Sequence, residues 1–191
     1  MTRTPWLPEA LQALAAVFRL ARFDRRGADA FADDLDQCAR SFRACVLAYP
    51  FYMAVLMGDF WGASPTSGAL FTAILAQSIG FVIECLIFPV AAISLLRWYH
   101  LETRWVRLVS AYNWWGLAQT MVVAAGLLLH KLSGGAPFAV DVLILIYLFC
   151  LLVEGFVFEI ILDVGVVTAG TLVVVDVLLG HFTAMIANAI S

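Results

Sequence analysis

Apolar residues run along this chain in long blocks separated by short polar segments, and the pattern changes near residue 40. Beyond that point the apolar blocks cover residues 41–61, 68–96, 108–129, 138–157 and 165–187. About 20 apolar residues in a helix suffice to cross the hydrocarbon core of a bilayer. The pattern therefore predicts an all-α integral membrane protein, in which residues 41–191 form a bundle of five transmembrane helices.

The boundary between the last two apolar blocks contains acidic residues but no basic ones. No Lys or Arg occurs between Ala136 and Ser191, and this stretch is too long for a single crossing. We place the break at residues 158–164, where Glu159 and Asp163 fall close together. Without this break the chain would have four spans, and its C-terminus would lie on the same side as its N-terminus.

Residues 1–40 form a polar arm with the pattern of amphipathic helices. Pro5 and Pro8 suit a helix start. Apolar residues then recur at helical spacing on one face, namely Leu11, Leu14, Phe18 and Ala21. Gly27 indicates a break, and a second set beyond it shares a face: Phe31, Leu35, Cys38 and Phe42. We expect one or two amphipathic helices at the membrane surface, with an ordinary solvated helical tail as the alternative.

The composition excludes a water-soluble globular protein. Hydrophobic residues make up 63% of the 191 residues and charged residues 13%, and the mean hydropathy is +0.95. A soluble domain is nearer half apolar and a quarter charged, and it could not bury this much apolar surface. The four cysteines form no CxxC pair and lie in or beside apolar blocks, so we expect buried thiols rather than disulfides or zinc ligands.

The basic residues are segregated, and this segregation predicts the orientation. Ten of the eleven lie in the arm, at the start of the first span or in the loop after the second: Arg3, Arg19, Arg22, Arg25, Arg26, Arg40, Arg43, Arg97, Arg104 and Arg107. Only Lys131 falls elsewhere. Basic residues in short flanking segments stay on the cytoplasmic side. We therefore expect a bacterial inner-membrane protein with a cytoplasmic N-terminus and a periplasmic C-terminus, although the composition also suits an organelle membrane.

Three acidic residues lie within predicted spans: Glu84 in the second, Glu154 in the fourth and Asp176 in the fifth. Ionisable groups in a membrane interior are costly and are functional candidates by default. No Lys or Arg lies inside a span to neutralise them, so we expect neutral, protonated carboxyls. Three interpretations stay open. The carboxyls fix helix packing through hydrogen bonds, they pair with a basic group on a partner subunit, or they form a proton or cation path with His181 and Gln119.

Other residues in the spans suit close packing of helices. Asn113 and Gln119 can form hydrogen bonds between helices. The last span carries small residues four positions apart, in the pairs Gly165–Ala169 and Gly180–Ala184. Such pairs let helices approach closely. They serve either packing within the chain or association between copies of it.

The arm carries a cluster of arginines, Arg19, Arg22, Arg25 and Arg26, that we expect to contact anionic lipid headgroups. The cluster lacks the interleaved aromatic residues of a nucleic-acid site, so no nucleic-acid partner is expected. The three histidines give no metal-ligand spacing. Motifs of nucleophile elbows, P-loops and dinucleotide sites are also missing. We therefore expect no catalytic residue, no metal and no cofactor.

Two runs of sequence are distinctive, "VSAYNWWGLAQ" at Val109–Gln119 and "TAGTLVVVDVLLG" at Thr168–Gly180. The layout of a polar cytoplasmic arm followed by about five closely spaced helices resembles small Yip1-type membrane proteins. The two runs resemble uncharacterised bacterial inner-membrane proteins of that general kind. The resemblance covers nearly the whole chain and implies an all-α, non-enzymatic membrane protein, and it supplies no catalytic residue.

These patterns together favour a non-enzymatic membrane protein that acts by association, either as a homo-oligomer or as an accessory subunit of a larger membrane complex. The alternative is a small proton- or cation-coupled permease or channel that uses the intramembrane carboxylates. A membrane enzyme ranks third, because loop-end residues such as Asp59, His130 and Asp141 form no catalytic pattern.

Overall fold

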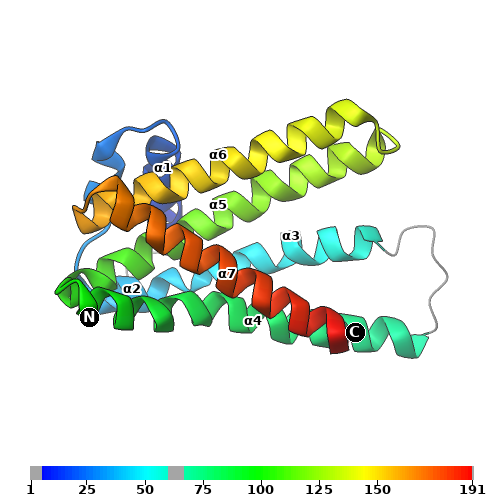
Figure 1. Ribbon diagram of the computed structural model, residues 1–191, viewed down its shortest axis with the longest axis horizontal. Helices are drawn as coiled ribbons and strands as arrows, with labels where there is room; N and C mark the ends of the chain where they lie inside the picture. Colours follow the sequence, from blue (N-terminus) through cyan, green and yellow to red (C-terminus); the bar gives the residue numbers. More distant parts are fainter. Residues whose placement is uncertain (1–5, 60–66, 191) are drawn as a thin grey trace.

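The computed structural model describes residues 6–59 and 67–190, and within these ranges the chain is helical with no strand. Figure 1 shows the helices in chain order. They are α1 (Trp6–Leu20), η1 (Arg25–Ala30), α2 (Leu35–Ser41), α3 (Arg43–Asp59), α4 (Ser67–Trp98), η2 (Glu102–Arg104), α5 (Trp105–Leu132), α6 (Pro137–Leu162) and α7 (Val166–Ile190). The predicted all-α class is confirmed.

Four helices of the described ranges are long and apolar enough to cross a bilayer. They are α4, α5, α6 and α7, and they correspond to four of the five predicted spans. The first predicted span corresponds to α3, which has 17 residues. The predicted end of that span at Trp61 and the predicted turn at residues 62–67 lie outside the described residues, except for Ser67, with which α4 begins.

The predicted break between the last two spans is confirmed, but it is much shorter than residues 158–164. Helix α6 continues to Leu162 and is capped by Asp163, whose backbone is left-handed with φ of 53°. The N–H of Val164 then donates to the carbonyl of Glu159 at 3.2 Å. Such a left-handed cap ends a helix while satisfying one of its last carbonyl groups, so α7 can begin at Val166.

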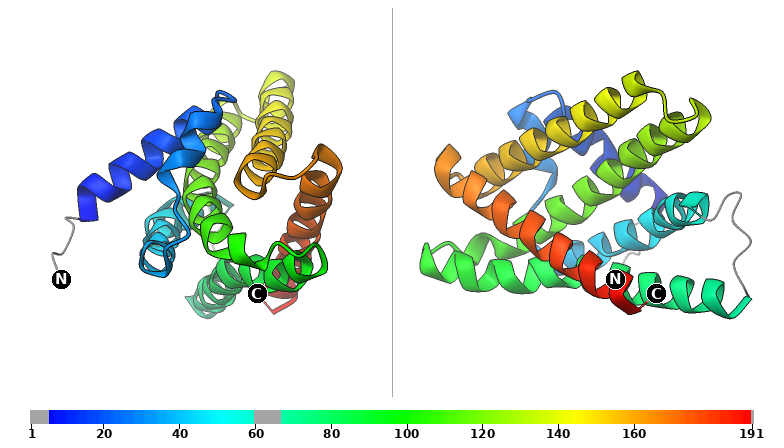
Figure 2. Two further views of the ribbon diagram at one scale, coloured as in Figure 1. Left: turned by 90° about the vertical axis from the view of Figure 1, so that its left-hand side faces the viewer. Right: turned by 45° about the vertical axis from the view of Figure 1, so that its right-hand side comes forward.

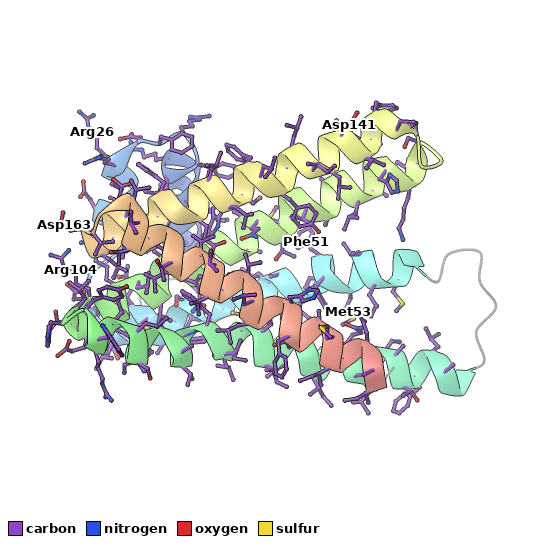
Figure 3. All side chains as sticks on the ribbon, viewed as in Figure 1. Arg26, Phe51, Met53, Arg104, Asp141 and Asp163 are labelled. Atoms are coloured by element: carbon purple, nitrogen blue, oxygen red, sulfur yellow. The ribbon has the colours of Figure 1, made fainter. Side chains whose placement is uncertain are left out.

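The polar connections gather at one end of the molecule. Arg26, Arg104 and Asp163 lie at this end, and Asp141 lies at the opposite end (Figure 3). Two ion pairs join the segments that meet here: Arg25 with Glu159 at 3.5 Å, and Arg104 with Asp163 at 3.6 Å. We call this end, where α4 meets α5 and α6 meets α7, the arginine-rich end.

Helix α5 is the central helix, with α3 on one side and α6 on another. Helix α7 starts beside α6 at the arginine-rich end and crosses the molecule diagonally to pack along α4 (Figures 1 and 2). Away from the arginine-rich end, the α5–α6 pair diverges from α3, α4 and α7 in both views. The crossing of α7 is what brings residues of α4, α5, α6 and α7 together.

The N-terminal arm packs on the bundle, and only part of the predicted apolar face takes part, since Leu14 and Ala21 are partly buried against the core. Leu11 and Phe18 of the predicted face are exposed, and the buried side of α1 consists mainly of small residues: Ala10, Ala13, Ala16, Val17 and Leu20. Alanines allow the helix to come close to η1 and α5, whereas larger side chains would hold it away. The second helical stretch also starts later than Phe31, because Asp34 caps α2 by accepting from the N–H of Asp36 at 3.0 Å.

Candidate functional site

A hydrogen bond between Tyr112 of α5 and Asp176 of α7 is the centre of the candidate site. The tyrosine hydroxyl donates to Oδ1 of Asp176 at 2.8 Å. The tyrosine ring is held by aromatic neighbours, since its centroid lies 4.5 Å from that of Phe88 and 6.3 Å from that of Phe158. Phe88 and Phe158 are fully buried, so the hydroxyl is fixed within an apolar environment.

Glu154 of α6 joins this pair. Glu154 is 1% exposed, and its carboxyl is close enough to that of Asp176 for the two groups to interact. Two carboxyl groups this close cannot both be ionised, because their negative charges repel strongly outside water. A proton shared between them removes the repulsion. Oε1 of Glu154 is buried and has no hydrogen-bond partner within the described ranges, so it is available to a proton or a donor.

Glu84 of α4 faces the same cluster. A Cβ atom built on Gly180 of α7 would lie 3.2 Å from Oε1 of Glu84. The carboxyl of Glu84 is also close enough to Asp176 for their charges to interact. The structure thus brings together Glu84, Glu154 and Asp176, whose convergence the sequence left open. We call these three acids and Tyr112 the carboxyl cluster.

Further polar side chains follow the α4–α7 contact away from the carboxyl cluster. Gln77 donates through Nε2 to Oδ1 of Asn188 at 2.7 Å, and its Oε1 accepts from the hydroxyl of Tyr52 at 2.8 Å. On the side of α4 that faces α3, the hydroxyls of Tyr49 and Ser78 lie 2.8 Å apart. The α4–α7 contact therefore carries hydrogen-bonding groups well beyond the three acids.

The remaining site candidates lie apart from the carboxyl cluster. His181 is exposed on α7, five residues beyond Asp176, and the structure does not bring it into the cluster. Gln119 is half-buried on α5, two turns beyond Tyr112. Asn113 is buried, as predicted for a packing residue, and donates to Oγ of Ser41 at 2.8 Å.

The two small-residue pairs of α7 do not form one continuous outward face. Ala169 is buried and Gly180 packs against Glu84, whereas Gly165 and Ala184 are exposed. Each pair thus has one member inside the protein and one outside. The arm arginines predicted to contact lipid are all exposed, and they are Arg19, Arg22, Arg25 and Arg26.

Sequence reasoning did not assign Tyr112 to the site, although it singled out the run that contains it. A tyrosine inside an apolar span is a signal, because a buried hydroxyl needs a partner. The described residues contain no group of three or more His, Cys, Asp and Glu that could hold a metal ion. Neighbouring carboxyl groups in an apolar environment can bind and exchange protons.

Comparisons with protein-family models, curated proteins and solved structures give no match for this chain. The resemblance to Yip1-type proteins stays a prediction. The residues of the carboxyl cluster are thus the basis for any functional proposal.

Proposed function

We propose that this chain is a proton-coupled permease or channel whose carboxyl cluster binds protons within the membrane. The observation that carries the proposal is the buried Glu154, whose Oε1 has no partner among the described residues, beside the hydrogen bond from Tyr112 to Asp176. Packing alone would not require two acids to meet in an apolar interior, since a single neutral amide could supply a hydrogen bond at lower cost.

The proposed membrane arrangement has five spans, with α3 as the first. Helix α3 is apolar and packs on α5, so it lies beside a helix that is itself a candidate span. The arginine-rich end holds the arm and the α4–α5 connection, which carry nearly all the basic residues. By the positive-inside rule this end faces the cytoplasm of a bacterial inner membrane, and the C-terminus faces the periplasm.

In the proposed mechanism, protons move between neighbouring carboxyl oxygens. Glu154 and Asp176 hold one proton between them in the resting state, and Tyr112 stabilises a charge on Asp176 by donating its hydrogen bond. When the free Oε1 of Glu154 accepts an incoming proton, the shared proton passes wholly to Asp176, which can give it to an ionised Glu84. Transfer from Asp176 to Glu84 then carries charge toward the hydrogen-bonding groups at Gln77 and Asn188.

The test is proton flux into proteoliposomes that contain the purified protein and a pH-sensitive dye. A potassium gradient with valinomycin supplies the driving potential. Wild-type protein is expected to acidify the lumen, and Glu154→Gln should lower the initial rate at least about tenfold, in line with the contribution of a positioned proton-transfer group. The matched control is Glu102→Gln, which removes an exposed carboxyl of η2 and should leave the rate unchanged. Flux equal to that of empty liposomes, or an unchanged rate in Glu154→Gln, would refute the proposal.

Association is the second candidate function, as a homo-oligomer or an accessory subunit. The observation in its favour is the part of the α5–α6 pair that diverges from the other helices, where large apolar side chains are exposed: Leu128, Leu129, Phe138, Ile144, Leu145 and Leu148. Lipid covers such a surface as well as protein does. Purification in a gentle detergent with mass measurement tests this candidate, and a monomeric particle without a co-purifying protein would exclude it.

A further inference from the structure

We propose that a cavity between the N-terminal arm and α3 is a binding site for the phosphodiester group of an anionic membrane phospholipid. The cavity has a volume of about 210 Å³. Its lining comes from α1, from the α2–α3 segment and from α5: Trp6, Glu9, Ala10, Arg40, Arg43, Val46, Leu47 and Trp114. It is separate from the carboxyl cluster and from the exposed arginines of the arm.

The charges at the cavity favour an anion. Glu9 is engaged chiefly by Arg40, whose Nε lies 2.8 Å from Oε1 and 3.0 Å from Oε2 of Glu9. Arg43 is only 3.9 Å from Glu9 at its nearest approach, and its side chain is 50% exposed. Two guanidinium groups thus face one carboxylate, which leaves one net positive charge beside an otherwise apolar cavity. Guanidinium groups match the geometry of phosphate oxygens.

The apolar lining favours a lipid over a soluble phosphate. Val46 is 73% exposed and Leu47 37% exposed on α3, directly beyond Arg43 along the helix. Trp6 on α1 is also exposed, and Trp side chains are enriched where headgroups meet acyl chains. Neighbouring residues on the outer face of α1, Leu7 and Leu11, are exposed and apolar. These side chains suit the glycerol region and upper acyl chains that follow a phosphodiester.

The size of the cavity fits one part of a lipid. Sites that enclose a whole small molecule have volumes of about 300–1,000 Å³, and this cavity is smaller. A phospholipid would place its phosphodiester beside Arg43 and its chains along α3, in contact with the bilayer. The lipid would then join the arm to the first helix of the bundle, next to the Glu9–Arg40 ion pair.

The experiment is native mass spectrometry of the full chain in a non-ionic detergent, titrated with phosphatidylglycerol or with phosphatidylcholine. Wild-type protein is expected to retain one phosphatidylglycerol at concentrations about tenfold below those needed for phosphatidylcholine. Arg43→Gln should remove this preference, since charge-assisted hydrogen bonds to phosphate are the strong ones. Arg43→Lys, which keeps the charge, should retain most of it.

The matched control is Arg22→Gln, which removes one exposed positive charge of the same arm outside the cavity and should keep the preference. Equal losses in Arg43→Gln and Arg22→Gln would indicate diffuse surface attraction and overturn the proposed site. Equal retention of the two lipids by wild-type protein would also overturn it. Glycerol 3-phosphate serves as a soluble phosphate compound for comparison. If the protein retained it as strongly as it retains the lipid, the assignment to a lipid would be overturned. Circular dichroism of each variant checks that the helices remain intact.

Discussion

The hydroxyl of Tyr112 lies 2.8 Å from Oδ1 of Asp176, and this hydrogen bond joins the central helix α5 to the diagonal helix α7. The bond connects residues 64 positions apart in the sequence. It fixes the depth at which α7 crosses the bundle, and it holds one of the three acids in a defined orientation. The stability of the fold and the geometry of the carboxyl cluster thus depend on the same contact.

Tyr112→Phe is expected to destabilise the protein by about 1–2 kcal/mol, because it leaves the Asp176 oxygen without its donor. Asp176→Asn alone should cost less, since the amide oxygen still accepts from Tyr112. A double-mutant cycle of Tyr112→Phe with Asp176→Ala, which removes the acceptor, measures the coupling between the two side chains from the midpoint of unfolding by detergent titration. The control is Tyr147→Phe, because Tyr147 is 45% exposed on α6. Additive effects of the two changes would show that the hydrogen bond contributes nothing.

The sequence predicted the helices well, because long apolar blocks and the segments between them are local features. It also marked the three acids, since a charge in an apolar block is visible without a structure. It could not show that Glu84, Glu154 and Asp176 meet. Their convergence depends on the angle at which α7 crosses α4, and this angle is set by close contacts such as that of Gly80 with Ala187.

In the N-terminal arm, the sequence pattern did not show which face of α1 packs on the rest of the protein. Helical spacing identified Leu11 and Phe18 as part of an apolar face for the membrane surface, but it did not identify the face that packs on protein. The structure buries Ala13 and Ala16 instead, because small side chains let two backbones approach and large ones do not. In a membrane protein, exposed large residues cost little when lipid covers them, so hydrophobicity alone does not identify the face that packs on protein.

The contact between α4 and α7 predicts a specific cross-link. A Cβ atom built on Gly80 would lie 3.0 Å from the Cβ of Ala187, so a small separation of the two helices brings the pair into the range of about 3.5–4.5 Å at which disulfides form. Gly80→Cys with Ala187→Cys should therefore oxidise readily, in a background where the native cysteines are replaced by alanine. Mobility on a non-reducing gel after mild oxidation reports the bond. Gly80→Cys with Gly170→Cys is the control, because residues 170 and 187 are about 25 Å apart along α7 at 1.5 Å per residue. Equal cross-linking of both pairs would contradict the diagonal course of α7.

Cys38 should be protected from alkylation in a pH-dependent way. It lies on α2, outside the spans, and burial raises the pKa of its thiol above the ordinary value of 9.0. Because the folded pKa is the higher one, the neutral thiol contributes stability that is complete below pH 9.0 and is lost as the pH rises through the folded pKa.

With the other native cysteines replaced by alanine, iodoacetamide at pH 8 should label Cys38 at least about tenfold more slowly than an exposed cysteine. The comparison is Leu35→Cys in a Cys38→Ala background, since Leu35 is 69% exposed on the same helix. Equal labelling rates would show that α2 is not packed as described.

Gly27→Ala should release the arm from the bundle. A Cβ atom at this position would lie 2.5 Å from the carbonyl oxygen of Ala16 and 2.8 Å from Cγ of Leu20. The backbone oxygen cannot move aside without shifting α1, and overpacking of this kind costs about 1–3 kcal/mol. That energy is enough to separate α1 from η1 and to free the backbone around the exposed arginines between them, which trypsin must unfold locally before it cleaves. Cleavage after Arg22 or Arg25 should therefore become several-fold faster than in wild-type protein, as measured by mass spectrometry of timed digests. Gly170→Ala is the control, because nothing lies within 4 Å of its added Cβ. Cleavage of Gly27→Ala at the wild-type rate would mean that the alanine face of α1 does not hold the arm on the bundle.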